Sequence, residues 1–329
     1  KNLKWYYRPS ARLIQPESAA YLNLRAWIAN NYNNKKDKAV KNINVQSIFG
    51  ISVALVLGAA VAFAGSQGGA SFNGMPVFVI CGLLAFGMNW LGYIPSYIAQ
   101  TEHYYDFMGS VTYVTLLLVA VTLTEEMTTR SIILAVCIGV WAIRLGTFLF
   151  GRVRKAGFDR RFTKMKTIPL QFLMTWTLQG LWVFITASAG LAAITTSQSV
   201  DFGVVGLCGL GLWVIGFGIE IVADHQKTVF RAENKSGFIT SGLWAYSRHP
   251  NFFGEILLWI GVAVMALPVL VGWQYFTLIS PVFVTFLLMF VSGVRMLENS
   301  GRKRWGEEPE YQDYIKRTSV LVLLPKRSI

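Results

Sequence analysis

Polar side chains that could bind a cofactor are concentrated in one short stretch, GLWAYSRHPNFFGE, at residues 242–255. An arginine fork matches the oxygens of a phosphate, a carboxylate accepts hydrogen bonds from ribose hydroxyls, and an asparagine pairs with a carboxamide. The stretch continues directly into the apolar run ILLWIGVAVMALPVLVGW, so these groups are predicted to open a membrane helix. The five side chains are Tyr246, Arg248, His249, Asn251 and Glu255.

Some of these cationic side chains have a simpler interpretation. His249 precedes Pro250, and this pattern often marks the start of a helix. Arg152 could be a cation at a helix end whose head group reaches the interface. Arg144 lies about two turns deeper in the same apolar run, and an ionisable group at that depth is a functional hypothesis by default.

Charged residues in other apolar segments are predicted to reach the same membrane depth as the 242–255 stretch. Arg144 and Arg152 are eight residues apart, and Glu220 and Asp224 are four apart, so each pair shares one helix face. Separate helices would then bring arginines, carboxylates, Asn and Tyr around one cavity. Such a cavity suits a cofactor with phosphates, ribose hydroxyls and an amide.

The composition explains why these charges are informative. The chain is 53% hydrophobic and 14% charged, whereas soluble domains carry about 25% charged residues. A spanning helix needs about 20 mainly apolar residues. The sequence therefore predicts an all-α polytopic membrane bundle of about seven to eight helices. The predicted spans are 47–65, 75–100, 107–124, 131–151, 168–195, 202–223, 252–273 and 275–297.

The basic residues predict the topology. With eight spans, 27 of the 30 Lys and Arg residues fall in segments on one side of the membrane, and Arg130 alone falls on the other. The positive-inside rule then places both termini on the cytoplasmic or equivalent face. Which membrane this is, whether endoplasmic reticulum, organelle or bacterial inner membrane, stays open.

Two other site classes are disfavoured. A nucleic-acid surface would not explain why the +13 net charge alternates with the spans. The three cysteines lie in apolar runs without a C-x-x-C pair, and the three histidines show no H-x-x-x-H spacing. We therefore expect no metal site and no disulfide framework.

Several stretches together resemble one family. GLWAYSRHPNFFGE, TEHYYDFMGSVTY (101–113), WAIRLGTFLFGRV (141–153), GFDRRF (157–162) and IEIVADHQK (219–227) are similar to membrane reductases related to steroid 5-alpha-reductase. The similarity points in particular to the uncharacterised branch that shares that enzyme's C-terminal domain. It covers about residues 75–325 in order and spacing.

The resemblance implies a bundle of about seven spanning helices with a cytoplasm-facing pocket for NADPH. More loosely, it extends to isoprenylcysteine methyltransferases, which bind S-adenosylmethionine. The cofactor-binding residues that it implies are Arg144, Arg152, Arg161, Glu220, Asp224, Gln226, Tyr246, Arg248, His249, Asn251, Glu255, Glu298, Tyr311 and Tyr314.

The catalytic residues are predicted less directly from the resemblance than the cofactor-binding residues. In steroid 5-alpha-reductases a Glu and a Tyr on early helices are thought to polarise the substrate ketone, and this pair has no aligned counterpart in the chain. The nearest polar cluster lies around the 101–113 stretch. For acid catalysis we predict Tyr97, Glu102, His103 and Asp106.

Four regions are predicted along the chain. Residues 1–46 form a basic polar extension. Its start, KNLKWYYRPSARLIQPES, is predicted to be extended or in short helices, and NNYNNKKDKAVKN is predicted to be a solvated linker. Residues 47–74 hold an additional membrane helix and a loop. Residues 75–297 form the reductase-like bundle. Residues 298–329 form a polar tail that packs on the cofactor side.

The functional hypotheses are therefore three. The first is NADPH-dependent reduction of a lipophilic enone, steroid-like or other unsaturated lipid, with the substrate arriving laterally from the membrane. The second is an S-adenosylmethionine-dependent methyltransferase, whose cofactor has no phosphates and needs fewer arginines than the chain offers. The third is a non-catalytic subunit of a larger membrane assembly, with residues 1–46 docking a protein partner.

Overall fold

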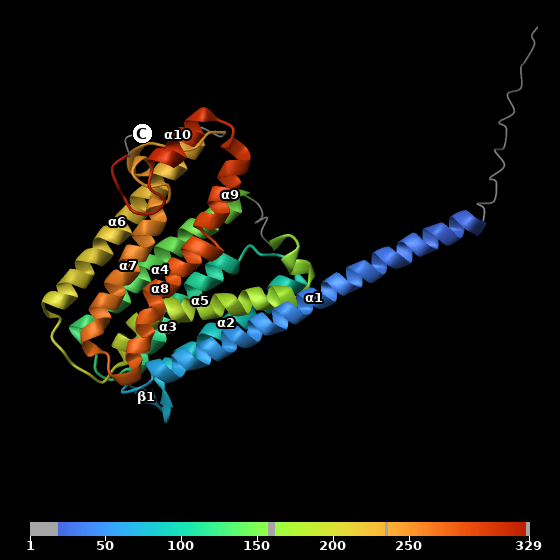
Figure 1. The fold of residues 1–329 in the computed structure, drawn as a ribbon. Helices are drawn as coiled ribbons and strands as arrows, with labels where there is room; N and C mark the ends of the chain where they lie inside the picture. The colour runs from blue at the N-terminus through green and yellow to red at the C-terminus, as the bar shows by residue number, and fades with distance from the viewer. Residues whose placement is uncertain (1–18, 157–161, 234–235, 327–329) are drawn as a thin grey trace, which may run out of the picture. The chain divides into compact units, whose positions relative to one another are not determined.

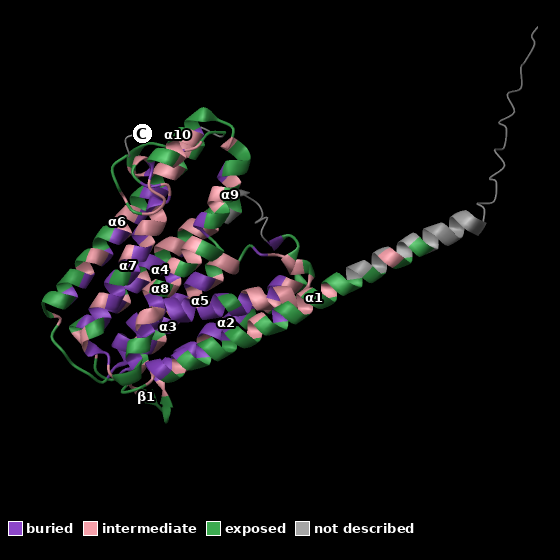
Figure 2. Ribbon diagram, in the orientation of Figure 1, coloured by how far each residue is buried: buried purple, intermediate pink, exposed green. Residues whose placement is uncertain are grey.

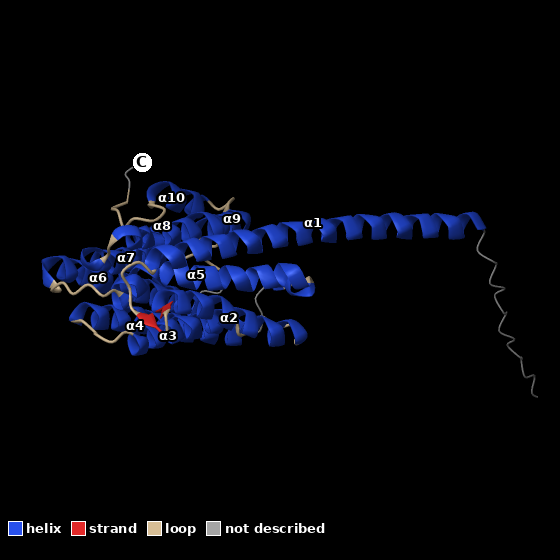
Figure 3. Cartoon of the chain, turned by 90° about the horizontal axis from the view of Figure 1, so that it is seen from below, coloured by secondary structure: helices blue, strands red, loops and turns tan. Residues whose placement is uncertain are grey.

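The chain folds almost entirely into helices. The structure is a computed structural model that describes residues 19–156, 162–233 and 236–326. Across these ranges the exception is one short antiparallel hairpin, in which β1 (Ser71–Phe72) pairs with β2 (Met75–Pro76) (Figure 3). Asn73 and Gly74 at its tip both have positive φ, as a two-residue type I′ turn requires. The all-helical prediction is confirmed.

Eight helical segments within the described ranges are long and apolar enough to cross a membrane. The protein is therefore a multi-pass integral membrane protein, as predicted. Short 3₁₀ turns, η2 (Met165–Thr167), η3 (Gly242–Ala245) and η4 (Leu267–Val269), lie between or at the ends of these segments. The spans lie in α1 (Ala19–Gly65), α2 (Val77–Ile98), α3 (Tyr105–Leu123), α4 (Thr129–Ala156), α5 (Pro169–Thr195), α6 (Gly203–Glu233), α7 (Pro250–Ala266) continuing through η4, and the segment Gly272–Trp305.

The N-terminal region corrects one prediction. Contacts divide the chain into two compact units, Lys1–Ser47 and Ile48–Ile329. Residues 30–42, predicted as a solvated linker, are helical and belong to α1. The stretch holds no proline or glycine, and its lysines and alanine favour helix, so nothing in it stops the helix. The finer division of residues 48–329 stays a prediction.

Helix α5 is the centre of the second unit. It is buried along nearly its whole length, and its segment TASAGLAA (186–193) is made almost entirely of small residues (Figure 2). Small side chains let neighbouring helices approach closely in a membrane. Ser188 Oγ donates to the carbonyl of Thr277 at 3.0 Å, and Ser280 Oγ donates to the carbonyl of Thr186 at 2.5 Å. Both bonds attach α5 to the last span.

Helices α6 and α7 pack side by side through glycines (Figure 1). A Cβ built on Gly216 would lie 2.5 Å from the nitrogen of Leu258, and one built on Gly254 would lie 2.7 Å from the nitrogen of Glu220. Backbones this close leave no room for a side chain. The glycine-rich run of residues 206–218 thus permits close helix packing at Gly216.

The last span corrects a second prediction, that of one continuous helix over 275–297. It consists of a 3₁₀ segment η5 (Gly272–Leu278), α8 (Ile279–Phe286), a π turn η6 (Leu287–Val291) and α9 (Val294–Trp305). The helix breaks between η6 and α9 at Gly293, where a Cβ would collide with the carbonyl of Leu288. The break redirects α9 and the following α10 (Pro309–Arg317), which begins at Pro309. Helix α9 carries Glu298.

Candidate cofactor site

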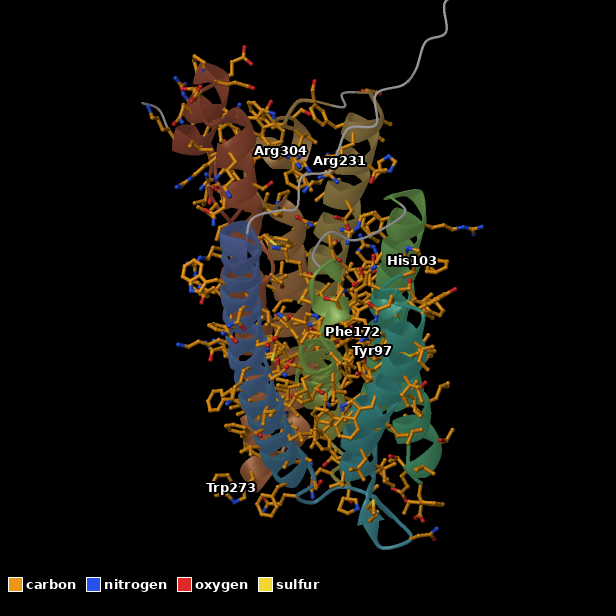
Figure 4. The ribbon with its side chains drawn as sticks, turned by 90° about the vertical axis from the view of Figure 1, so that its right-hand side faces the viewer. Tyr97, His103, Phe172, Arg231, Trp273 and Arg304 are labelled. Atoms are coloured by element: carbon orange, nitrogen blue, oxygen red, sulfur yellow. The ribbon has the colours of Figure 1, made fainter. Side chains whose placement is uncertain are left out.

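A pocket of about 150 Å³ lies where the C-terminal half of α6, the loop after it and the start of α7 face α9 and α10. Arg231 and Arg304, which belong to opposite walls, lie near one end of the bundle (Figure 4). The lining residues are Lys227, Phe230, Arg231, Gly237, Phe238, Ile239, Trp244, Arg248, His249, Leu297, Glu298, Ser300, Gly301, Arg304, Trp305, Tyr311 and Tyr314.

Cations dominate the charge of this pocket. Lys227, Arg231, Arg248 and Arg304 line it, and Glu298 is the one carboxylate among its lining residues. Arginine and lysine attract phosphate, and arginine also matches its geometry. The pocket is therefore suited to a ligand with several negative charges.

Two of these cations, Lys227 and Arg231, lie on a part of α6 beyond the predicted end of this helix. Glu220, Asp224, Lys227 and Arg231 are spaced by four, three and four residues, so they lie along one helix face. The predicted helix ended at residue 223, whereas α6 continues to Glu233. The periodicity itself was a usable signal for Lys227 and Arg231. Arg304 had no comparable signal, because it lies beyond the unpredicted break at Gly293.

Arg248 and His249 form a charge cluster with Glu298. Arg248 Nη1 donates to Glu298 Oε2 at 2.9 Å, and His249 Nε2 lies 3.0 Å from Glu298 Oε1. Glu298 and Arg302 are one turn apart on α9, but the hydrogen bonds of Glu298 go to the segment before α7. Burial lowers the pKa of His249, and the hydrogen bond to Glu298 offsets part of this effect. The His249 ring is therefore neutral near pH 7.

Aromatic rings build the wall opposite α6. Phe238, from the loop after α6, packs edge-on to Tyr311 at 5.0 Å and also contacts Trp305 at 5.6 Å and Tyr314 at 5.8 Å between ring centres. Tyr314 Oη donates to the carbonyl of Trp244 at 2.8 Å. Burial raises the pKa of both tyrosines, so both hydroxyls are neutral hydrogen-bond donors near pH 7.

The C-terminal strap, residues 318–326, holds the Tyr246–His249 segment in place. Arg248 N donates to the carbonyl of Ser319 at 2.8 Å, and Leu324 N donates to the carbonyl of Tyr246 at 3.2 Å. Ser247 Oγ donates to the carbonyl of Leu321 at 2.7 Å and accepts from His249 N at 3.1 Å. The strap therefore fixes the backbone from which two pocket residues project.

A second polar cluster connects α4 to α6. Arg144 on α4 donates to both Glu220 and Asp224, and Trp141 Nε1 donates to Glu220 Oε2 at 3.2 Å. The side chains of Glu220 and Asp224 are 3% and 11% exposed, so this is a largely buried ion-pair network. Glu255 on α7 lies within electrostatic range of both carboxylates.

The predicted cofactor residues thus divide into groups. Arg248, His249, Glu298, Tyr311 and Tyr314 line the pocket. Arg144, Glu220 and Asp224 are brought together, but they belong to the α4–α6 network and are not among the lining residues. Their participation in binding stays a prediction.

The remaining predicted cofactor residues have other surroundings. Gln226 Oε1 accepts from Leu243 N at 3.0 Å and so supports the loop before α7. Tyr246 is half exposed, and Asn251 Oδ1 is buried without a hydrogen-bond partner in the described part of the chain. Arg152 Nη2 lies 3.8 Å from Asp106 Oδ2. Arg161 lies outside the described residues.

The four predicted catalytic residues gather near the α2–α3 junction. Glu102 is buried and bonds Lys166 Nζ at 2.7 Å, Asp106 lies near Arg152, and Tyr97 stacks on Tyr93 with ring centres 5.6 Å apart. His103 is exposed. Tyr97 and His103 lie further from the end of the bundle than Arg231 and Arg304 (Figure 4). None of the four lines the pocket, and their catalytic role stays a prediction.

Comparison with known proteins identifies the family. The family described as "Protein of unknown function (DUF1295)" matches residues 92–318. The chain belongs to the DUF1295 family. The matched region contains the pocket and the α4–α6 network.

Two kinds of curated relative share part of this DUF1295 chain. An uncharacterized protein of Schizosaccharomyces pombe is 26% identical over 223 residues, 57% of this chain and 62% of the relative. The 3-oxo-5-alpha-steroid 4-dehydrogenase 1 proteins of Bos taurus and Macaca fascicularis are 29% and 31% identical over 118 residues, each 35% of this chain and 40% of the relative. The chain thus spans less than two thirds of each. No solved structure gives a significant match.

Proposed function

We propose that this protein is an NADPH-dependent reductase of a lipophilic enone or another unsaturated lipid. The observation that carries the proposal is the pocket at the end of a membrane bundle, where four cations face one carboxylate. The similarity to proteins named as steroid dehydrogenases supports the reaction class. We infer that the substrate is a lipid from the membrane spans of the chain and not from any residue in the pocket.

The pocket residues fit the chemistry of the cofactor. Arg231, Arg304 and Lys227 offer positive charge for phosphates, and the aromatic wall offers flat apolar surface for a base. Arg248 Nε is a buried donor and His249 Nδ1 a buried nitrogen, and neither has a hydrogen-bond partner in the described part of the chain. Unpaired polar atoms beside a pocket are expected where a ligand completes the bonding.

When bound, NADPH supplies a hydride to an electron-poor carbon. The residues of the chain bind the cofactor, orient it and exclude water from the site. Reduction of an enone also requires a proton and a group that stabilises negative charge on the carbonyl oxygen. Tyr97, Glu102, His103 and Asp106 remain our predicted acid group. Arg144 holds the two α6 carboxylates, which keeps the helix face below the pocket in one arrangement.

The proposal is tested by ligand binding to the full chain in detergent micelles. NADPH, NADH and S-adenosylmethionine are titrated separately, with thermal stability and nicotinamide fluorescence as readouts. A ligand at one hundred times its dissociation constant stabilises the folded state by about 2.7 kcal/mol. We expect this stabilisation with NADPH, a weaker one with NADH, which lacks one phosphate, and none with S-adenosylmethionine.

The pattern of ligand binding distinguishes the three functional hypotheses. Stabilisation by S-adenosylmethionine without NADPH would replace the reductase with a methyltransferase. Binding of none of the three would favour a non-catalytic role. If NADPH binds, consumption of NADPH in the presence of progesterone, a 3-oxo-4-ene steroid used as a probe, tests the substrate class.

A further inference from the structure

The bonds of Glu298 define the protonation of the His249 ring. Glu298 accepts from Arg248 through Oε2 at 2.9 Å, and its Oε1 lies 3.0 Å from His249 Nε2. An ionised carboxylate can only accept hydrogen bonds, so the proton must be on Nε2. Because burial lowers the pKa of His249, the ring carries one proton near pH 7, and Nδ1 is left with a free lone pair.

This lone pair is buried and unused. His249 Nδ1 has no hydrogen-bond partner in the described part of the chain, and the residue is 5% exposed. The ring stacks on Phe252 with centres 5.6 Å apart and planes 8° from parallel, so its orientation is fixed from a second side. A buried acceptor without a donor is costly, and native proteins usually complete it with a ligand or water.

We propose that Glu298 is a positioning residue that holds His249 as the Nε2–H tautomer, so that Nδ1 accepts a hydrogen bond from an N–H or O–H group of the bound ligand. The inference rests on the proposed function for the identity of that ligand, since a dinucleotide offers ribose hydroxyls and a carboxamide N–H. It assigns direct contact with the ligand to His249 and an indirect role to Glu298.

The fold explains how Glu298 reaches this position. The break at Gly293 divides the last span and starts α9 in a new direction, one turn before Glu298. Helix α9 then faces the start of α7, and its carboxylate bonds two consecutive residues there. The strap on the other side bonds Ser247 and Arg248, so the segment that carries His249 is held from two directions.

Other charges around the ring do not supply the missing donor. The groups that act on His249 are Glu298 from α9, Lys227 from α6 and Arg248 from its own segment. Lys227 Nζ lies 4.5 Å from the ring centre of Trp244. Arg248 Nε is itself unpartnered in the described residues. The pair of unused atoms, one donor and one acceptor, suits a ligand that presents both kinds of group.

The first test is nitrogen NMR on the full chain labelled at histidine, with the His249 signals identified through a His249→Asn variant. We expect Nε2 protonated and Nδ1 unprotonated at pH 7, and a shift of the Nδ1 signal on addition of NADPH. His225 is exposed and serves as an internal control whose signals should not move. A proton on Nδ1, or an Nδ1 signal that stays in place while NADPH fluorescence reports binding, would overturn the proposal.

The second test compares Glu298→Gln with Glu298→Ala. Glutamine keeps an oxygen that accepts from Nε2–H, so NADPH binding should weaken less than it does in the alanine variant, for which we expect about a tenfold loss. Glu307→Gln removes an exposed charge from the same region and should leave binding unchanged. Equal losses for Gln and Ala would show that charge alone matters and would overturn the positioning role.

Failure of the proposed function gives a different result from failure of this inference. If wild-type protein does not bind NADPH, the reductase proposal fails, while the tautomer of His249 is still measurable without ligand. If NADPH binds and the tautomer or the Nδ1 response is not as described, the inference fails and the reductase proposal stands.

Discussion

At the scale of single residues, the pocket is defined by an imbalance of charge. Four cations face Glu298, which is already shared between Arg248 and His249. Within the described part of the chain, Lys227, Arg231 and Arg304 make no ion pair with a carboxylate. Positive charge without a protein counter-ion is the expected state of a site that receives phosphate.

The arginines of this pocket give the first prediction. Arg231→Gln and Arg304→Gln should each weaken NADPH binding by about three- to tenfold, because each removes a charge-assisted contact that solvent partly screens. The affinity is measured by nicotinamide fluorescence at two salt concentrations. Arg295→Gln, an exposed arginine of α9 outside the pocket, is the matched control and should bind as wild type. Equal losses in all three variants would point to a general field effect.

His249 gives a pH prediction. Its pKa is lowered on folding, so the unfolded chain takes up the proton first as the pH falls below about 6.5. The stability contribution of the neutral ring is therefore complete above that pH and is lost as the pH falls through the folded-state pKa. Thermal unfolding of wild type and His249→Asn is compared from pH 7.5 to 5.5. The wild type should lose more stability on acidification, and parallel curves would contradict the prediction.

Residue-level reasoning from sequence reached part of this site. The 242–255 stretch stood out because polar groups are costly at the start of a membrane helix, and two of its polar members, Arg248 and His249, line the pocket. Tyr311 and Tyr314 were predicted as cofactor-binding residues from the family resemblance. Lys227 was missed because a lysine near a helix end looks like a topology charge, and its burial against Trp244 depends on a tertiary contact.

At the scale of elements, α6 and α7 position both polar clusters. Their glycine contacts bring Gly254 against the backbone of Glu220, which places Glu255 beside the α4–α6 network. The sequence predicts such close packing from glycine content. It does not predict which glycines face the partner helix, because the helix phase is fixed only when both helices are docked.

A glycine pair on α6 gives the element-level prediction. Gly216→Ala places a methyl group 2.5 Å from the nitrogen of Leu258 and should destabilise the protein by about 1–3 kcal/mol. Gly218→Ala meets no atom within 4 Å and should be neutral or slightly stabilising, since alanine favours helix. Thermal unfolding in the same detergent measures both. The variants should also differ in NADPH affinity, and a Gly216→Ala protein as stable as wild type would refute close packing.

The broken last span shows where sequence periodicity fails. Residues 275–297 are apolar enough for one helix, and a hydropathy pattern does not distinguish α from 3₁₀ or π geometry. Ser292 and Gly293 were the local signal, because a serine–glycine pair permits a sharp change of direction. The break has consequences for the site, since it sets the direction of the helix that carries Glu298 and Arg304.

At the scale of the whole molecule, basic residues are concentrated in alternate segments between the predicted spans. The pocket, the strap and α10 draw on the segments after the sixth span and after the last one, where basic residues are frequent. Segments between the other ends of the spans carry few cations. A bundle of this kind can present a lipid-facing body and a phosphate-binding end in one chain, which is the arrangement that a membrane reductase with a water-soluble cofactor needs.

The topology itself is the last prediction. With eight spans and the basic segments on one side, Lys303 and Glu126 should lie on opposite faces of the membrane, with Lys303 on the cytoplasmic or equivalent face. Both residues are exposed, so Lys303→Cys and Glu126→Cys in a background without Cys81, Cys137 and Cys208 report sidedness by labelling with an impermeant thiol reagent in sealed vesicles. One variant should be labelled before detergent is added and the other only after it. Labelling of both before detergent in intact vesicles would contradict the orientation, and with it the assignment of the pocket to the side that holds NADPH.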